Sequence, residues 1–376
     1  MQLSVIILNY NVRYFLEQCV LSVQKALEEL NPDASGEIIV IDNASTDDSC
    51  EMIKTKFPHI KLIENKTNYG FPKGNNIGVA QAKGEYICIL NPDTVVGEDT
   101  FSKILNTKNW QLNTGIIGCK LIDGSGNFLP ESKRGIPTPW VAFTKIFGLY
   151  NISNYFGKYY AQHLSENESG EVAILVGAFM MMQRELYLEI GGFDEKCFMY
   201  SDDIDLSYMV KKLGNTNFYF HETTVIHYKG ESTVRNGMYM KRFREAMQFF
   251  YKKHFKKSWF FNVMMQVGSF VFSLLKKNQQ KNKVRPIDEY IVFSRENLEL
   301  NLTKTTTYLS DFNQFKNQRK KNIEIIFDTT TFSFAEIITF MESNKYKNIS
   351  YKNYILSSNY LIGSCNSNDR GQIILL

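Results

Sequence analysis

The chain has 376 residues, 44% of them hydrophobic and 22% charged, with a formal net charge of +4. This length predicts two or three domains, and the globular composition excludes a disordered tail, a collagen-like fibre and a disulfide-stapled miniprotein. The six cysteines lie far apart without any CxxC or Cys/His cluster, which excludes zinc-ribbon and thioredoxin-like proteins and suits a reducing compartment.

Short apolar runs alternate with helix-like stretches in the first quarter of the chain. The runs lie at 3–8, 37–41, 60–63 and 85–90, and the helix-like stretches at about 12–30, 46–56 and 72–82. This alternation predicts βαβ units and a largely parallel sheet. No basic segment precedes the first run, which is typical of a buried strand and not of a signal peptide.

Polar side chains follow three of these predicted strands. Asn9 ends the first strand, Asp42 and Asn43 end the second, and Asn91 and Asp93 follow the fourth. Ligands of open α/β sheets bind beyond the carboxyl ends of the strands. Helix caps and turns also use Asn and Asp, but that explanation suits one strand end better than three together.

The common phosphate-binding motifs are absent. No GxxxxGK[ST] occurs and no GxGxxG follows the first strand, so P-loop NTPases and dinucleotide-dependent dehydrogenases are excluded. The stretch 123–127 is typical of a hairpin turn. The Gly-containing entry to the third helix, 68–76, predicts backbone N–H groups and Lys73 near an anion.

Three carboxylates crowd the start of a predicted helix in the middle of the chain. Asp202, Asp203 and Asp205 come after a buried strand at 172–182 that is broken at Gly177. Like charges repel, so the cluster is costly unless it opens a helix or serves a cation or a reaction. An acidic first turn would explain one Asp, whereas three favour function.

A histidine ends the next apolar strand. His227 is followed by Lys229, and a His near a carboxylate cluster suggests a metal ligand with a lysine for phosphate. A lone His is more often structural, so this signal is weak by itself.

Taken together, these segments resemble glycosyltransferase family 2, the inverting nucleotide-sugar transferases, and in particular its rhamnosyltransferase-like branch. The resemblance covers about residues 1–235 and depends on eight motifs in family order. They are VIILNYN, VIDNASTDDS, NYGFPKGNN, LNPDT, GAFMMMQRE, GGFDE, FMYSDDIDLS and HYKGES. The resemblance implies a GT-A-type fold, which is a Rossmann-like mixed α/β sheet, and a nucleotide-diphosphate sugar donor.

The resemblance also implies donor and metal contacts. Asp42 would bind the nucleobase, with Asn9 and Asn43 nearby, and the two lysines, Lys73 and Lys229, would lie on the donor side. Residues 91–93 take the place of the DxD motif, so Asp93 would bind a divalent metal, Mn²⁺ or Mg²⁺, that bridges the diphosphate. This sequence departs from DxD at Asn91, which gives the metal one fewer charged ligand.

The remaining implied roles concern the reaction itself. Asp203 would be the general base that takes the proton from the acceptor hydroxyl, with Gly177 and Asp202 on the acceptor side. His227 matches a late metal ligand of related transferases. One base and one displacement invert the anomeric configuration, and no second nucleophile is required.

Basic residues are concentrated in one segment. Residues 241–285 hold twelve Lys or Arg and a single acid, a net charge of +11, which leaves the rest of the chain acidic. Within them, 258–275 is apolar except for one stripe of polar residues, which predicts an in-plane helix on an anionic membrane surface. A helix packed in the protein core is nearly as good an explanation. Nucleic acid is a poorer one, since the lysines flank an apolar block.

The sequence thus predicts a glycosyltransferase domain over 1–237, a basic amphipathic segment over 238–285 and a small α/β domain of unknown role over 286–376. We expect an inverting glycosyltransferase at the cytoplasmic face of the membrane, acting on a saccharide or lipid-linked acceptor in cell-surface polysaccharide assembly. The alternatives are a membrane-associated scaffold with a degenerate site and a sugar-phosphate nucleotidyltransferase.

Overall fold

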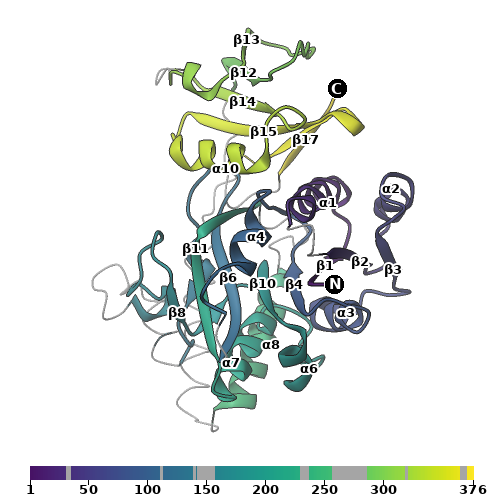
Figure 1. The fold of residues 1–376 in the computed structure, drawn as a ribbon, viewed down its shortest axis with the longest axis vertical. Helices are drawn as coiled ribbons and strands as arrows, with labels where there is room; N and C mark the ends of the chain where they lie inside the picture. The colour runs from purple at the N-terminus through teal and green to yellow at the C-terminus, as the bar shows by residue number, and fades with distance from the viewer. Residues whose placement is uncertain are drawn as a thin grey trace.

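The computed structural model describes residues 1–30, 35–110, 113–138, 141, 157–228, 237–255, 286–317, 321–364 and 371–376. These residues form a large α/β unit with a smaller one above it (Figure 1). The predicted helix at 258–275 lies outside the described residues. No helix in the described part of the chain is long and apolar enough to cross a membrane.

The large unit is built on a mixed sheet of nine strands among the described residues, in the order β3-β2-β1-β4-β10-β6-β11-β5, with β8 paired to β11. The strands are β1 (Leu3–Asn9), β2 (Gly36–Asp42), β3 (Lys61–Glu64), β4 (Tyr86–Leu90), β5 (Thr94–Val95), β6 (Thr114–Ile122), β8 (Gly170–Val172), β10 (Phe179–Gln183) and β11 (Thr216–His227). A separate pair is formed by β7 (Lys133–Arg134) and β9 (Ile174–Leu175).

The four predicted N-terminal strands are confirmed as parallel neighbours. Every residue of β1 is buried, because helices cover both faces of the sheet, and this explains its unbroken apolar run. The strand predicted at 172–182 is instead three short strands, β8, β9 and β10. Of these, β10 runs antiparallel between β4 and β6. The turn predicted at 123–127 is confirmed, since the Gly126 N–H donates to Asp123 O at 3.0 Å.

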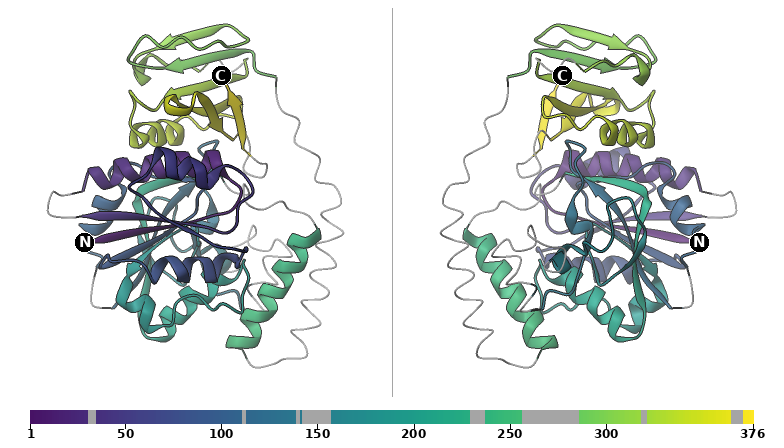
Figure 2. Two further views of the ribbon diagram at one scale, coloured as in Figure 1. Left: turned by 90° about the vertical axis from the view of Figure 1, so that its right-hand side faces the viewer. Right: turned by 90° about the vertical axis from the view of Figure 1, so that its left-hand side faces the viewer.

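Helices cover the sheet on both sides (Figure 2). One apolar core lies under α1 (Arg13–Glu28), α2 (Ser49–Lys56) and α4 (Thr100–Leu105). The other lies under α3 (Gly70–Val79), α6 (Arg184–Glu189) and α7 (Asp202–Lys212). The next helix, α8 (Gly237–His254), packs its apolar face on Ile174 and Ile204.

The smaller unit is a six-stranded sheet of the order β13-β12-β14-β15-β16-β17 within the described residues. Its elements are β12 (Glu289–Phe293), β13 (Thr306–Leu309), β14 (Ile323–Asp328), α10 (Phe334–Ser343), β15 (Ile349–Ile355), β16 (Tyr360–Gly363) and β17 (Gln372–Leu375). A capping box of Ser333 and Glu336 begins α10. The second α/β unit predicted at the C-terminal end is therefore present, whereas the exact domain boundaries stay a prediction.

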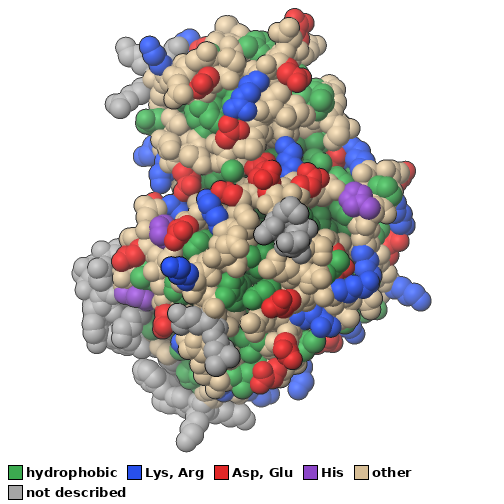
Figure 3. Space-filling view, viewed as in Figure 1, with side chains coloured by type: hydrophobic (Ala, Val, Ile, Leu, Met, Phe, Trp, Pro, Cys, Tyr) green, Lys and Arg blue, Asp and Glu red, His purple; other side chains and the backbone are tan. Residues whose placement is uncertain are grey.

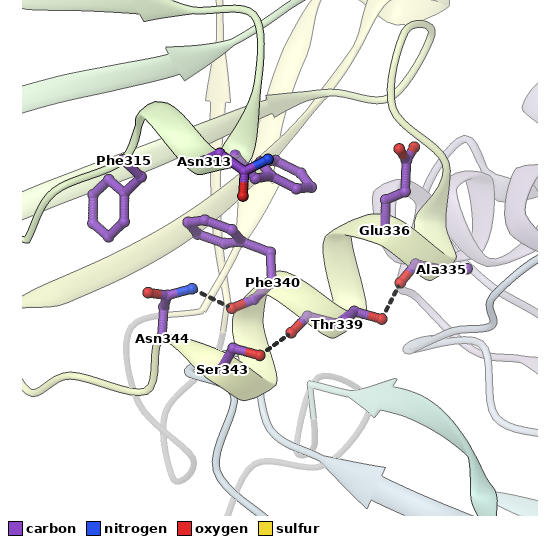
Figure 4. Close-up of a pocket in the computed structure, with 9 residues that line it drawn as sticks. Asn313, Phe315, Ala335, Glu336, Thr339, Phe340, Ser343 and Asn344 are labelled. Carbon is purple, nitrogen blue, oxygen red and sulfur yellow. Dashed lines mark hydrogen bonds between the residues drawn. The ribbon is translucent and has the colours of Figure 1, made fainter.

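The outer side of α10 borders an open cavity of about 530 Å³ (Figure 4). The rings of Phe315 and Phe340 line it. The hydroxyl groups of Thr339 and Ser343 donate to carbonyl oxygens of α10 itself, at 2.8 and 2.9 Å. The hydroxyl groups on this face of α10 are therefore satisfied within the helix.

Candidate active site

The carboxyl ends of β1 and β2 carry the first two predicted donor residues. Asn9 and Asp42 are partners in the parallel register. The Asn9 Nδ2 group donates to Asp42 Oδ1 at 2.8 Å, and the Ser45 N–H donates to Asp42 Oδ2 at 2.8 Å. Both side chains are buried, and Asn9 Oδ1 has no hydrogen-bond partner among the described residues. The strand register therefore brings together the two residues predicted for the nucleobase.

Asn43 supports the loop that follows β3. Its Nδ2 group donates to Gly70 O at 3.1 Å and to Asn68 Oδ1 at 3.2 Å, and its Oδ1 atom accepts from Asn65 Nδ2 at 2.9 Å. Gly70 has a φ of +81°, and a Cβ there would lie 2.6 Å from Phe198 O, so this turn requires glycine. The amide of Asn43 thus holds the loop, and its contact with a donor stays a prediction.

Lys73 lies on α3 beside the same loop. Its Nζ atom is 4.5 Å from the centroid of the Tyr69 ring. A Cβ at Gly74 would lie 3.3 Å from Asn43 Nδ2, so α3 packs directly on the strand ends. Lys73 is therefore at the predicted edge of the sheet, whereas Lys229 lies outside the described residues.

Asn91, Asp93 and His227 come together at the next strand end. The antiparallel pairing of β5 with β11 places His227 opposite Thr94. His227 Nε2 lies 3.4 Å from Asp93 Oδ1 and 3.4 Å from Asn91 Nδ2. Asp93 and His227 are 4% and 7% exposed, and Asp93 Oδ1 and His227 Nδ1 have no hydrogen-bond partner in the described part of the chain. We call Asp93 and His227 the Asp93–His227 pair.

This pair fits a divalent cation. Carboxylate oxygen and imidazole nitrogen are both common metal ligands, and each side chain keeps a buried polar atom without a partner. Within the described residues, no three His, Cys, Asp or Glu side chains gather to form a closed metal site. A cation at the pair would therefore need further oxygen ligands from a bound molecule, such as a diphosphate.

Asp203 lies in the first turn of α7 and accepts from three donors. Its Oδ2 atom accepts from Arg134 Nη2 at 2.5 Å and from the Gly177 N–H at 3.1 Å, and its Oδ1 atom accepts from the Ile204 N–H at 2.7 Å. Burial lowers the pKa of Arg134, but Asp203 and Tyr159 more than offset this effect, so the net pKa is raised. The guanidinium beside Asp203 is therefore charged.

Asp202 lies beside Asp203 and close to Gly177. A Cβ at Gly177 would lie 3.3 Å from Asp203 Cβ, 3.7 Å from the Phe71 ring and 3.8 Å from Asp202 Oδ2. Burial and repulsion from Asp203 raise the pKa of Asp202 to about 7. A Cβ at position 177 would therefore be tight against Asp203 and in ordinary contact with Phe71 and Asp202, and the place of Gly177 and Asp202 on the acceptor side stays a prediction.

The start of β10 joins the two halves of the site. The Asn91 N–H donates to Ala178 O at 3.0 Å, and the preceding residue, Gly177, donates to Asp203. Asn91, whose side chain lies 3.4 Å from His227, and Asp203 are therefore both hydrogen-bonded to one short backbone segment.

Asp205, the third acid of the predicted cluster, contacts α8 instead. Its Oδ1 atom lies 2.5 Å from His254 Nε2, and its Oδ2 atom lies 2.7 Å from Lys253 Nζ. Lys253 also pairs with Asp194 at 2.8 Å. The acidic cluster thus divides into two residues at the site and one that fixes a helix.

The sequence analysis did not identify Arg134 or Phe71 as site residues. Arg134 lies in β7, and its partner strand β9 comes some forty residues later in the chain. A single basic residue with no periodic pattern and a distant partner gives no signal in the sequence. Phe71 stands inside the NYGFPKGNN motif, where its proximity to Gly177 was not expected.

Two rhamnosyltransferases are similar to this chain over more than half of its length. The N-acetylglucosaminyl-diphospho-decaprenol L-rhamnosyltransferase of Mycobacterium tuberculosis is 25% identical over 245 residues, which are 62% of this chain and 78% of the relative. Rhamnosyltransferase WbbL of Escherichia coli is 27% identical over 221 residues, which are 55% of this chain and 78% of the relative.

Among solved structures, the chain is similar to the mannosyltransferase PcManGT from Pyrobaculum calidifontis in complex with GDP-Man and Mn²⁺. The two are 17% identical with a TM-score of 0.47, over 72% of this chain and 69% of that one.

The model of the family described as glycosyl transferase family 2 matches residues 4–191, half of the chain. This match covers β1 through α6, which include the strand ends with Asn9, Asp42 and Asp93. The GT-A-type α/β fold expected from the resemblance is confirmed by this match and by the mixed sheet. The chain belongs to glycosyl transferase family 2 and is a glycosyltransferase.

Proposed function

We propose that the chain is an inverting glycosyltransferase that moves a sugar from a nucleoside-diphosphate donor to a hydroxyl group of a lipid-linked saccharide in polysaccharide assembly. The observation that carries the proposal is that the Gly177–Ala178 backbone is hydrogen-bonded both to Asp203 and to Asn91, whose side chain lies beside the Asp93–His227 pair. A site for the leaving group and a separate carboxylate joined to the same backbone segment suit a single displacement with one base.

The donor would bind across the ends of β1, β2 and β4. Asp42, with Asn9 beside it, would contact the nucleobase, and the unsatisfied Asn9 Oδ1 atom would accept a hydrogen bond from it. Asn43 would hold the 65–70 loop over the donor. Lys73 and Lys229 would face the diphosphate, where positive charge is favourable.

Asp93 and His227 would hold a divalent metal ion, Mn²⁺ or Mg²⁺, with Asn91 beside them. When bound, such an ion supplies positive charge that stabilises the departing diphosphate. Asn91 contributes no charge, so the diphosphate itself would provide much of the binding energy for the ion.

Asp203 would take the proton of the acceptor hydroxyl as the new bond to the anomeric carbon forms and the bond to the phosphate oxygen breaks. Its Oδ1 atom accepts from the Ile204 N–H and keeps lone-pair capacity for that hydroxyl. Arg134 fixes the orientation of the carboxylate through its hydrogen bond to Oδ2. Asp202 and Gly177 would border the acceptor.

The proposal also includes the lipid-linked acceptor and the location at the inner face of the membrane. They are supported by the basic segment 241–285 and by the diphospho-decaprenol acceptor in the name of the Mycobacterium relative. An anionic membrane surface would then be the partner of that segment.

A panel of nucleotide-sugars, tested for protection against thermal unfolding with and without Mn²⁺, would identify the donor. The stabilising donor should then be consumed with a lipid-diphosphate saccharide, and NMR of the product should show inverted anomeric configuration. Retained configuration would refute the single displacement. Asn91, which stands where the DxD motif has an aspartate, also fits a degenerate site in a membrane-associated scaffold. Stabilisation by nucleoside diphosphates without any turnover would favour that function.

A further inference from the structure

The smaller C-terminal sheet contacts the larger unit just beyond the Asp93–His227 pair. Glu98 follows β5, and its two carboxylate oxygens accept from the N–H groups of Phe334 and Ala335, each at 2.8 Å. These residues begin α10, whose first N–H groups lack partners within the helix and whose positive end attracts a carboxylate. A residue of the transferase unit therefore completes a helix of the C-terminal unit.

Apolar packing joins the same two regions. Val95 and Ile226 are partners in the β5–β11 ladder, and both are buried in one apolar cluster with Tyr228 and Phe334. Val95 lies between Asp93 and Glu98 in the chain, and Ile226 and Tyr228 flank His227. Both members of the Asp93–His227 pair are thus attached to backbone that the C-terminal unit covers.

Hydrogen bonds reinforce this attachment. The Tyr228 N–H donates to Asp93 O at 3.0 Å, which ties the two strands of the pair together. The Asn353 Nδ2 group, on β15, lies 3.5 Å from the Tyr228 hydroxyl oxygen. A Cβ at Gly97 would lie 3.2 Å from Ala335 Cβ, so the segment after β5 and the start of α10 approach each other closely beside Glu98.

We propose that residues 286–376 act as a support that sets the position of the Asp93–His227 pair, with Glu98 as the principal positioning residue. The carboxylate of Glu98 fixes the segment that follows β5, and the apolar cluster fixes β5 itself through Val95, so the Asp93 carboxylate has one orientation toward His227. The proposal deepens the proposed function, on which it rests for the identity of the ligand at the pair.

The same boundary offers a matched control. Glu342, near the other end of α10, pairs with Lys120 of β6 at 2.9 Å, and charged side chains line this boundary between the two units (Figure 3). Glu98→Gln and Glu342→Gln each remove one carboxylate charge between α10 and the larger unit. They differ in that the first contact holds the segment that follows Asp93 and β5, whereas the second holds β6, which contributes no residue to the Asp93–His227 pair.

The test compares the full chain with Glu98→Gln, Glu342→Gln and Tyr228→Phe. Tyr228→Phe keeps the ring and removes the contact with Asn353, so it is the milder variant if Glu98→Gln folds poorly. Hydrogen exchange of peptides covering 91–98 and 222–228 measures, without any ligand, how firmly the backbone around the Asp93–His227 pair is held. Electron paramagnetic resonance with UDP, dTDP or GDP present measures the affinity of the Asp93–His227 pair for Mn²⁺.

In Glu98→Gln, we expect faster exchange in both peptides and about tenfold weaker Mn²⁺ binding, as is typical when residues that orient metal ligands are changed. Tyr228→Phe should give a smaller change of the same kind, and Glu342→Gln should match the wild type in both measurements. Equal effects of the two Gln variants, or faster exchange with unchanged Mn²⁺ binding, would overturn the proposal. If no nucleotide supports Mn²⁺ binding to the wild type, the proposed function fails, and unchanged exchange in Glu98→Gln would separately overturn the support.

Discussion

Replacing Asp203 by Asn tests the proposed base directly. The substitution keeps the shape of the side chain but removes its charge and turns one acceptor oxygen into a donor. That new N–H₂ group must face either Arg134 Nη2, now 2.5 Å from Oδ2, or the Ile204 N–H, now 2.7 Å from Oδ1. Either orientation sets a donor against a donor, so the variant loses both the base and part of the hydrogen bonding.

Two magnitudes follow from this geometry. Loss of a general base lowers the rate of transfer by about 10²–10⁴-fold. Arg134 is 8% exposed, and breaking a buried ion pair from one side costs about 3–5 kcal/mol of folding stability. That cost is a large share of the roughly 5–15 kcal/mol that stabilises a typical domain. Donor affinity should change little, because Asp203 is not among the residues proposed to bind the donor.

The assay must therefore separate catalysis from folding. A double variant, Arg134→Met with Asp203→Asn, leaves no unpaired charge and should recover much of the stability while transfer stays lost. Asp205→Asn removes another buried carboxylate from the same turn of α7 and should keep the rate within a few fold, because its partners are on α8. Initial rates, urea unfolding and calorimetric binding of the donor would be measured for each. Transfer by Asp203→Asn within tenfold of the wild type would refute the base assignment.

The remaining predictions concern metal, pH and membrane. Asp93→Ala and His227→Ala should each raise the Mn²⁺ concentration needed for half-maximal transfer, the first more strongly because it removes charge, and turnover that is indifferent to EDTA would contradict a metal role. The pKa of Asp202 is raised in the folded chain, so its contribution to stability is present below the unfolded pKa near 4 and lost as pH rises toward 7. Asp202→Asn should consequently be more stable than the wild type at pH 8, by roughly 2–4 kcal/mol, and equally stable at pH 3, as thermal unfolding at the two pH values would show. Changing three lysines of the basic segment to Gln should release the chain from anionic vesicles in a flotation assay, while transfer to a soluble acceptor continues. The three are Lys252, Lys256 and Lys257. A wild-type chain that does not bind such vesicles would contradict a membrane role. Lys253 is spared because it pairs with two carboxylates beside α7.

The strand pattern was predictable because it depends on local properties. β1, β2 and β4 are covered on both faces, so each is a continuous apolar run that stands out from its surroundings. Parallel strands bring their carboxyl ends to one edge, so the polar residues after them were expected to lie together. The observed contact between Asn9 and Asp42 follows from that register alone.

The parts that escaped prediction depend on pairings between distant segments. The reversed strand β10 enters between β4 and β6, although nothing in its own residues indicates direction. Arg134 is placed by the β7–β9 pair, and Glu98 has the composition of a surface residue but contacts the start of α10, which lies far away in the sequence. Local propensity and spacing carry no information about such partners.

The three acids at 202–205 show how far a cluster in sequence can be interpreted. The crowding itself does not indicate where each acid lies in the fold, since two of them border Gly177 and the third contacts α8. Asp203 is paired with Arg134, Asp202 is left as a buried neighbour with a raised pKa, and Asp205 contacts Lys253 and His254. Because Lys253 lies beyond the expected boundary at 237, and α10 lies further on still, later parts of the chain contact the edges of a site whose candidate residues lie between Asn9 and His227.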